Sequence, residues 1–189
     1  MPDIDIDFAN RDQILAKIKH VPARLKNRKH NTGVYCHRVP VDPFKVLCTL
    51  DHKEADEAGF FKLDMLNVSI YKDIKSEAHL KELMEREPIW ELLKHPEFTS
   101  QVFHLSGNEE LVSTLEPSSI EQLAAVLAII RPSKRYLAKD VDWDRINREV
   151  WTKPEDGSYY FKKAHAFSYA MACVVHMNLL CEQISEDAS

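Results

Sequence analysis

Three aspartates near the start of the chain, Asp3, Asp5 and Asp7, alternate with Ile4 and Ile6. Side chains two positions apart on a strand point the same way, about 6.5 to 7 Å apart, so the spacing predicts a strand with one acidic face. Such carboxylates suit Mg²⁺, and two ions about 3.5 to 4 Å apart can activate an attacking oxygen and stabilise a departing phosphate oxygen. The alternative is a solvated edge strand, because charged residues also protect exposed sheet edges.

A run of cationic and imidazole residues follows this acidic segment. Its members are Lys17, Lys19, His20, Arg24, Lys26, Arg28, Lys29, His30 and Arg38. The run could hold phosphate groups, although a solvated helix and loop has the same composition. The formal net charge of −5 argues against nucleic-acid binding through bulk electrostatics, so any phosphate contact depends on where these cations lie.

The composition indicates a globular protein. A chain of 189 residues that is 44% hydrophobic can bury a substantial core. We find no continuous apolar span of membrane length and a polar start unlike a signal peptide, so we expect a cytoplasmic protein without a membrane partner. Cys36, Cys48, Cys173 and Cys181 lack CxxC spacing, which favours buried, reduced thiols over a zinc site.

The first third of the chain has the pattern of short strands. After the acidic segment, residues 10–19 are predicted to form a helix capped by Asn10 and ended by Pro22. Further strands are predicted over residues 33–39, 44–50 and 60–66, which are rich in β-branched and aromatic side chains.

The remaining two thirds have helical spacing. Helices are predicted over residues 70–93 with an interruption at Pro88, and over residues 108–115, 118–130, 143–151 and 165–180. Ser118 or Ser119 is the expected cap of the third of these helices, and Pro132 its terminator. The chain is therefore predicted to be an α+β protein, strand-rich over residues 1–69 and helical over residues 70–189, within one compact unit.

Several short blocks together carry a family resemblance. They are Pro-Asp-Ile-Asp-Ile-Asp-Phe at 2–8, Lys-His-Asn-Thr-Gly-Val at 29–34, Ala-Gly-Phe-Phe-Lys-Leu-Asp-Met-Leu at 58–66, Val-Phe-His-Leu at 102–105, Leu-Ala-Ile-Ile-Arg-Pro at 127–132 and Tyr-Phe-Lys-Lys-Ala-His-Ala-Phe-Ser-Tyr-Ala at 160–170. In this order the blocks resemble the palm and fingers of C-family bacterial replicative DNA polymerases, exemplified by the alpha subunit of DNA polymerase III. Each block alone has a high false-positive rate, but the preserved order is hard to produce by chance.

The resemblance implies a reduced polymerase palm, built on a small mixed sheet, with a helical finger-like lobe. It implies catalytic, metal-binding roles for Asp5, Asp7 and Asp64, with Asp3 as an outer acid. The implied reaction is transfer of a deoxynucleotide from its triphosphate to a primer 3′ end on template DNA, with Mg²⁺ or Mn²⁺ as cofactor. The implied substrate-binding residues are Lys62, Arg131, Lys163, Lys29 and His30.

Departures from the family pattern keep other functions open. The Gly-Ser palm motif is missing, the thumb is reduced to residues 9–28, and Thr32-Gly33 and Ser133 stand where the family has a glycine pair and a glycine. One alternative is a non-catalytic module, of a kind that would suit a viral genome, that binds DNA or a replisome protein. Another is one chain of a split polymerase that is completed by a partner, with the first strand as the docking edge.

Overall fold

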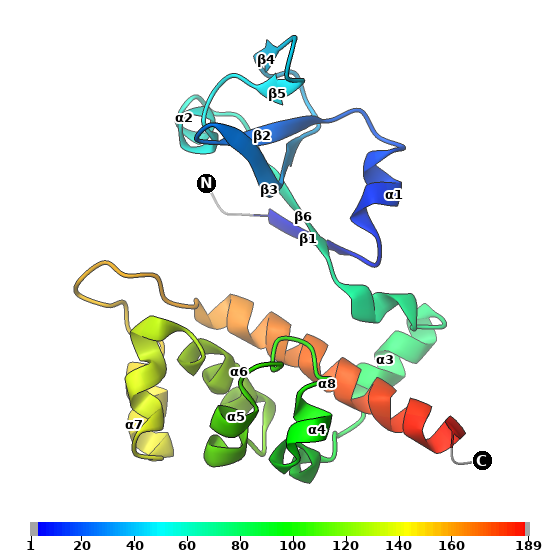
Figure 1. The fold of residues 1–189 in the computed structure, drawn as a ribbon, viewed down its shortest axis with the longest axis vertical. Coiled ribbons are helices and arrows are strands. Elements are labelled where there is room, and N and C mark those ends of the chain that lie inside the picture. The colour runs from blue at the N-terminus through cyan, green and yellow to red at the C-terminus, as the bar shows by residue number, and fades with distance from the viewer. Residues whose placement is uncertain (1–3, 188–189) are drawn as a thin grey trace. The chain divides into compact units, whose positions relative to one another are not determined.

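The structure is a computed structural model that describes residues 4–187 (Figure 1). The chain divides into two compact units, residues 1–73 and residues 74–189, and each is described by itself. The first unit holds the strands and the second is helical, so the chain is an α+β protein with a small mixed sheet, as the sequence predicts.

The first unit is built on a four-stranded sheet of order β1-β6-β3-β2. The strands are β1 (Ile4–Phe8), β6 (Leu63–Asn67), β3 (Arg28–Tyr35) and β2 (Val21–Leu25). β1 runs parallel to β6, whereas β3 runs antiparallel to both of its neighbours. The acidic segment is therefore an edge strand, paired with the strand that carries Asp64.

Short elements complete the first unit. They are α1 (Arg11–Leu15), β4 (Val41–Asp42), β5 (Leu47–Cys48), α2 (His52–Glu57) and the 3₁₀ turn η1 (Ser69–Lys72). The Asn10 side chain accepts hydrogen bonds from the first amides of α1, as predicted for a helix cap. Asp51 and Glu54 form a capping box at the start of α2.

Apolar residues pack on both faces of this sheet. Val34 and Met65 lie with Leu15 of α1 in one cluster, and Tyr35 lies with Ala55 of α2 in another. Since Val34 and Tyr35 are adjacent on β3, they point to opposite faces. Each face of the sheet therefore contributes to a small core beside one of the two helices.

Three sequence predictions for this unit need correction. The helix predicted over residues 10–19 ends at Leu15, and strand β2, which the sequence analysis did not predict, begins at Val21 and accommodates Pro22 on a sheet edge. The strand predicted over residues 44–50 is reduced to β5. The Asp42 carboxylate accepts bonds from the amides of Phe44 and Lys45 and thereby forms a turn.

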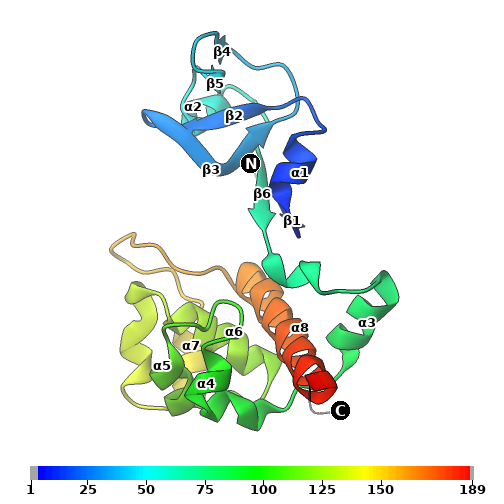
Figure 2. The same cartoon turned by 45° about the vertical axis from the view of Figure 1, so that its right-hand side comes forward.

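The second unit consists of helices around one long helix (Figures 1 and 2). Its elements are α3 (Glu77–Glu85), η2 (Trp90–Lys94), α4 (Pro96–Thr99), α5 (Glu109–Leu115), α6 (Ile120–Ile129), η3 (Pro132–Ala138), α7 (Trp143–Glu149) and α8 (Lys163–Asp187). Both α6 and α3 pack against α8. The segment predicted as a helix over residues 70–93 is broken into η1, α3 and η2.

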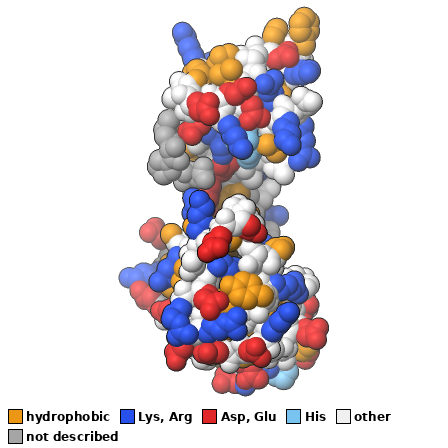
Figure 3. All heavy atoms as spheres, turned by 90° about the vertical axis from the view of Figure 1, so that its left-hand side faces the viewer, with side chains coloured by type: hydrophobic (Ala, Val, Ile, Leu, Met, Phe, Trp, Pro, Cys, Tyr) orange, Lys and Arg blue, Asp and Glu red, His pale blue; other side chains and the backbone are white. Residues whose placement is uncertain are grey.

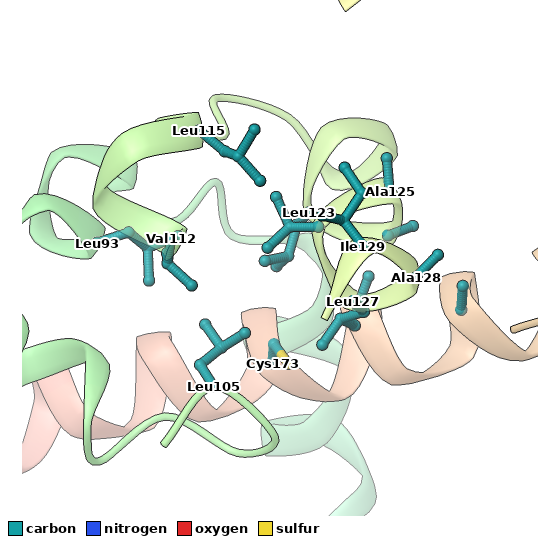
Figure 4. Packing of buried hydrophobic residues seen from close by; sticks show 14 of the residues in the cluster. Leu93, Leu105, Val112, Leu115, Leu123, Ala125, Leu127, Ala128, Ile129 and Cys173 are labelled. Carbon is teal, nitrogen blue, oxygen red and sulfur yellow. The ribbon is translucent and has the colours of Figure 1, made fainter. Parts of the chain in front are cut away.

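Helix α6 is the centre of the second core. Its residues from Leu123 to Ile129 are all buried, and Leu127 and Ala128 face α8 near Cys173 (Figure 4). Ser119 accepts a hydrogen bond from Gln122 at the start of this helix, and Pro132 opens η3 just after its end, as predicted.

The surface of each unit mixes Lys and Arg with Asp and Glu on the face drawn in Figure 3.

Helix α8 is the longest helix of the described residues, with 25 residues. By length and composition alone, Lys163–Glu186 is long and apolar enough to cross a membrane, and more than half of its most apolar window is buried inside the structure.

Candidate metal and nucleotide site

The acidic strand and the strand of Asp64 are joined in a fixed register. Asp5 is the Cα partner of Asp64 in the parallel pairing of β1 with β6, and Asp7 lies one pleat further along β1. Residues that are paired or two apart on a strand share a face, so all three carboxylates belong to one face of the sheet. Met65 alternates with Asp64 and packs in the cluster of Leu15 on the other face.

Asp64 is buried, and its carboxylate is contacted by Lys62, which directly precedes β6, and by residues of β3. The Lys62 ammonium donates to Oδ2, the Thr32 hydroxyl donates to Oδ1 at 2.7 Å, and His30 Nδ1 lies 3.8 Å from Oδ1. Burial by itself raises the pKa of Asp64, but the hydrogen bonds from Lys62 and Thr32 outweigh burial and hold that pKa below its ordinary value. Asp64 is therefore an anion at neutral pH.

Gly33 makes room for the Lys62 side chain. A Cβ atom at Gly33 would lie 2.7 Å from Lys62 Cδ and 3.1 Å from His30 Nδ1. The family resemblance places a glycine here, and the structure gives that glycine a steric reason: any larger side chain would push Lys62 away from Asp64.

His30 is fixed beside this ion pair by backbone hydrogen bonds. Its Nδ1 accepts from the amides of Gly33 at 2.9 Å and Thr32 at 3.3 Å. Burial and the Lys62 charge lower the pKa of His30. With Nδ1 acting as an acceptor, the neutral ring carries its proton on Nε2. His30 is thus placed as a neutral donor at the edge of the Asp64 site.

Asp7 lies in a different environment from Asp64. Its pKa is raised by partial burial and by the negative charge of Asp5, although the Tyr71 hydroxyl donates to Oδ2 at 3.5 Å and acts in the opposite direction. The repulsion between Asp5 and Asp7 is the effect that a bound cation would relieve.

The donor atoms of this face suit a hard divalent cation by chemistry and by register. Within residues 4–187, however, no group of three or more His, Cys, Asp or Glu side chains is arranged to hold a metal ion. The Lys62 ammonium occupies one oxygen of Asp64. A cation bound at that oxygen would therefore require Lys62 to leave it.

The other predicted substrate-binding residues lie elsewhere. Lys29 is exposed on β3, opposite Arg24 of β2. Arg131 and Lys163 belong to the second unit: the guanidinium of Arg131 lies 5.0 Å from the ring centroid of Phe161, and the ammonium of Lys163 lies 5.8 Å from that of Phe167. Both cations are therefore placed over aromatic faces.

Three of the sequence blocks meet in the second unit. His104 packs edge-on to Tyr169 with ring centroids 4.6 Å apart, and Phe161 lies 5.5 Å from Tyr169 and beneath Arg131. Burial and the Arg131 charge lower the pKa of His104, whose backbone is left-handed with φ of 62°. We call these four residues the arginine-aromatic cluster. It brings together residues from positions 102–105, 127–132 and 160–170.

Several residues that shape the site were not predicted from the sequence. Thr32, noted only as a departure from a glycine pair, binds Asp64, and Tyr71 binds Asp7. Neither has a signal in a single sequence, because each contact depends on how separate segments meet. Asp3 lies outside the described residues.

Comparisons of the chain with protein-family models, with curated proteins and with solved structures gave no match. The functional interpretation therefore depends on the geometry above and on the sequence resemblance.

Proposed function

We propose that this chain is a reduced palm-and-fingers nucleotidyltransferase that resembles C-family DNA polymerases. Its reaction would be the divalent-metal-dependent transfer of a deoxynucleotide to a primer 3′ end. Its substrates would be a deoxynucleoside triphosphate and primer-template DNA, and its location the cytoplasm.

The observation that carries this proposal is the register of β1 and β6. It makes Asp5 and Asp64 direct neighbours, adds Asp7 to the same face, and places Lys62 beside them. The resemblance assigns catalytic roles to these same three acids. An acidic strand that served only to protect a sheet edge would need no matching acid on the strand beside it.

Each residue has a defined task in this proposal. Asp5, Asp7 and Asp64 would hold Mg²⁺ or Mn²⁺, which supplies charge neutralisation and activates the primer hydroxyl. Lys62 would exchange its contact with Asp64 for a phosphate oxygen, since both partners are anionic oxygens. His30 would donate its Nε2 proton to a phosphate oxygen. The resemblance also assigns substrate-binding roles to Lys29 and, in the second unit, to Arg131 and Lys163.

A second function, a non-catalytic binding module, is favoured by the contact between Lys62 and Asp64. Because the protein's own ammonium neutralises the buried carboxylate, retention of Asp64 has an explanation that needs no metal. Such a module would bind DNA or a replisome protein, or would be completed by another polymerase chain.

Calorimetric titration separates these functions. Mg²⁺ or Mn²⁺ is added with a deoxynucleoside triphosphate to the natural chain, to the double variant Asp5→Asn, Asp64→Asn, and to the charge-matched control Asp12→Asn, Asp140→Asn. We expect metal-dependent nucleotide binding in the natural chain and the control, and its loss in the site variant. Equal binding in all three, or no binding in any, would contradict the proposed site.

Primer extension then tests the reaction itself. The nucleotidyltransferase should extend a labelled primer with Mg²⁺ or Mn²⁺, and Asp64→Asn should abolish extension while the variant keeps its circular-dichroism spectrum. Extension that appears only after a second polymerase chain is added would identify a split enzyme.

A further inference from the structure

A hollow in the first unit lies at the ends of β2 and β3, apart from the three carboxylates. Its volume of about 520 Å³ lies within the usual range for small-molecule sites, roughly 300 to 1,000 Å³. Lys19 and His20 line it from the segment before β2, and His37 and Arg38 line it from the segment after β3.

The charges around this hollow favour an anion. Lys19 and Arg38 are cations, and none of the described residues that line the hollow is acidic, although the whole chain has a formal net charge of −5. A hollow lined by two cations and by no acidic residue attracts an anionic group even on a protein of net negative charge. Arg38 can also bind two phosphate oxygens at once.

Cys36 and four apolar residues make up the rest of the lining. The apolar residues are Val21, Tyr35, Val39 and Val41, and Tyr35 is almost completely buried. A site that binds only inorganic phosphate does not need apolar lining residues. The combination of two cations with apolar residues therefore suits a ligand that has a phosphate at one end and a flat or apolar group at the other.

The imidazole of His37 is held in place before any ligand binds. Its Nε2 lies 2.9 Å from the carbonyl oxygen and 3.1 Å from the amide nitrogen of Phe61, and its ring stacks on Phe60 with centroids 6.0 Å apart. The ring of Tyr35 lies 5.8 Å from it. Because the His37 ring is exposed and fixed in this way, it offers a stacking surface to a base at little entropic cost.

We propose that this hollow, lined by Lys19, His20, His37 and Arg38, binds a nucleoside 5′-phosphate, either as a free nucleotide or as the 5′ end of a single strand. Lys19 and Arg38 bind the phosphate, and the apolar residues and the His37 ring receive the nucleoside. The site does not use Asp5, Asp7 or Asp64, so it is independent of the nucleotidyl transfer proposed above.

Cys36 supplies a reporter, because it is exposed and lines the hollow. The full chain is treated with iodoacetamide, an uncharged thiol reagent, in metal-free buffer, and alkylation rates at each cysteine are measured by mass spectrometry. Cys181, partly exposed in the second unit, is the internal reference. The probes are inorganic phosphate, thymidine 5′-monophosphate and a 5′-phosphorylated thymidine octanucleotide.

We expect thymidine monophosphate to slow alkylation of Cys36 severalfold without slowing that of Cys181. In the double variant Lys19→Ser, Arg38→Ser, the concentration that gives half protection should rise at least about tenfold, since two charge-assisted contacts are lost. The charge-matched control Lys53→Ser, Lys81→Ser should behave as the natural chain. Rates are compared with and without ligand within each variant, because nearby cations also affect thiol reactivity.

Comparison of the three probes identifies the source of the phosphate. A lower half-protecting concentration for the octanucleotide assigns the site to a strand end, and a lower one for the monophosphate assigns it to a free nucleotide. Three results would overturn the proposal. Inorganic phosphate could protect Cys36 as well as thymidine monophosphate does, the control variant could lose protection as the Lys19→Ser, Arg38→Ser variant does, or no probe could protect Cys36. Protection should persist in Asp5→Asn, Asp64→Asn, which separates this site from the metal site.

Discussion

At the scale of single residues, the first unit neutralises a buried carboxylate with its own side chains. Asp64 is bound by Lys62, which directly precedes its strand, and by Thr32 from the neighbouring strand. Breaking a buried ion pair is costly because the remaining charge loses its partner without regaining water. The Asp64 site therefore affects stability whether or not it also performs chemistry.

Replacement of Lys62 by Met should destabilise the protein at pH 7 by about 1 to 3 kcal/mol, because Asp64 stays buried without its cation. The folded-state pKa of Asp64 is held below the ordinary 3.8, so its contribution to stability is present above that pH and is lost as the pH falls through the folded pKa. The stability difference between Lys62→Met and the natural chain should therefore narrow below about pH 4. Urea denaturation at several pH values measures it.

The exposed lysine variant Lys53→Met is the control for this comparison. It removes one positive charge without unpairing a buried carboxylate, so its effect should stay within about 0.5 kcal/mol. A pH-independent difference between Lys62→Met and the natural chain would mean that lost packing, and not the charge of Asp64, determines the effect.

At the scale of elements, the turn between β4 and β5 contains a residue in an unfavourable conformation. Val46 is exposed and has φ of 48°, in the left-handed region that β-branched side chains rarely adopt. The turn is formed by the Asp42 carboxylate, which accepts from two amides that follow it. Local side-chain bonding thus imposes a backbone that Val46 itself disfavours.

Replacement of Val46 by Gly should therefore stabilise the protein by about 1 kcal/mol, since glycine adopts this conformation without a steric penalty. The same substitution at Val41, an exposed strand residue of β4, should destabilise it, because glycine weakens an extended segment. Thermal unfolding of both variants measures the two signs. Destabilisation by Val46→Gly would show that the contacts of the Val46 side chain stabilise the protein by more than its left-handed backbone destabilises it.

The elements that the sequence predicts well are those with local signals. Asn10 and Ser119 cap helices because their side chains bond amides two or three residues away. Strand β2 was missed because proline and alanine, here Pro22 and Ala23, are uncommon in strands, and pairing with β3 stabilises them there. The contact of Thr32 with Asp64 was out of reach for the same reason, since it depends on which strands become neighbours.

At the scale of the whole molecule, each unit has its own core. The larger one surrounds α6 and α8, and the smaller ones lie on the two faces of the sheet. The second unit contains all three tryptophans of the chain, Trp90, Trp143 and Trp151. Tryptophan fluorescence therefore reports directly on the unfolding of the helical unit.

Replacement of Leu123 by Ala should destabilise the helical unit by about 2 to 5 kcal/mol, because the side chain is fully buried and its loss leaves a cavity. Ile184→Ala on α8 is the control: Ile184 is exposed, so the change should stay near zero. Denaturation followed by tryptophan fluorescence measures both variants. A small effect of Leu123→Ala would indicate that the helices close over the missing side chain.

The parallel pairing of β1 with β6 also has a consequence for how the protein is made. Asp5 leaves the ribosome long before its partner Asp64, and the hairpin of β2 and β3 lies between them. Short-range pairing closes a small loop, whereas pairing of β1 with β6 must close a much longer one and is slower. We therefore expect the hairpin to form first and the acidic strand to join the sheet only after β6 has been synthesised, so that the carboxylates meet late in folding.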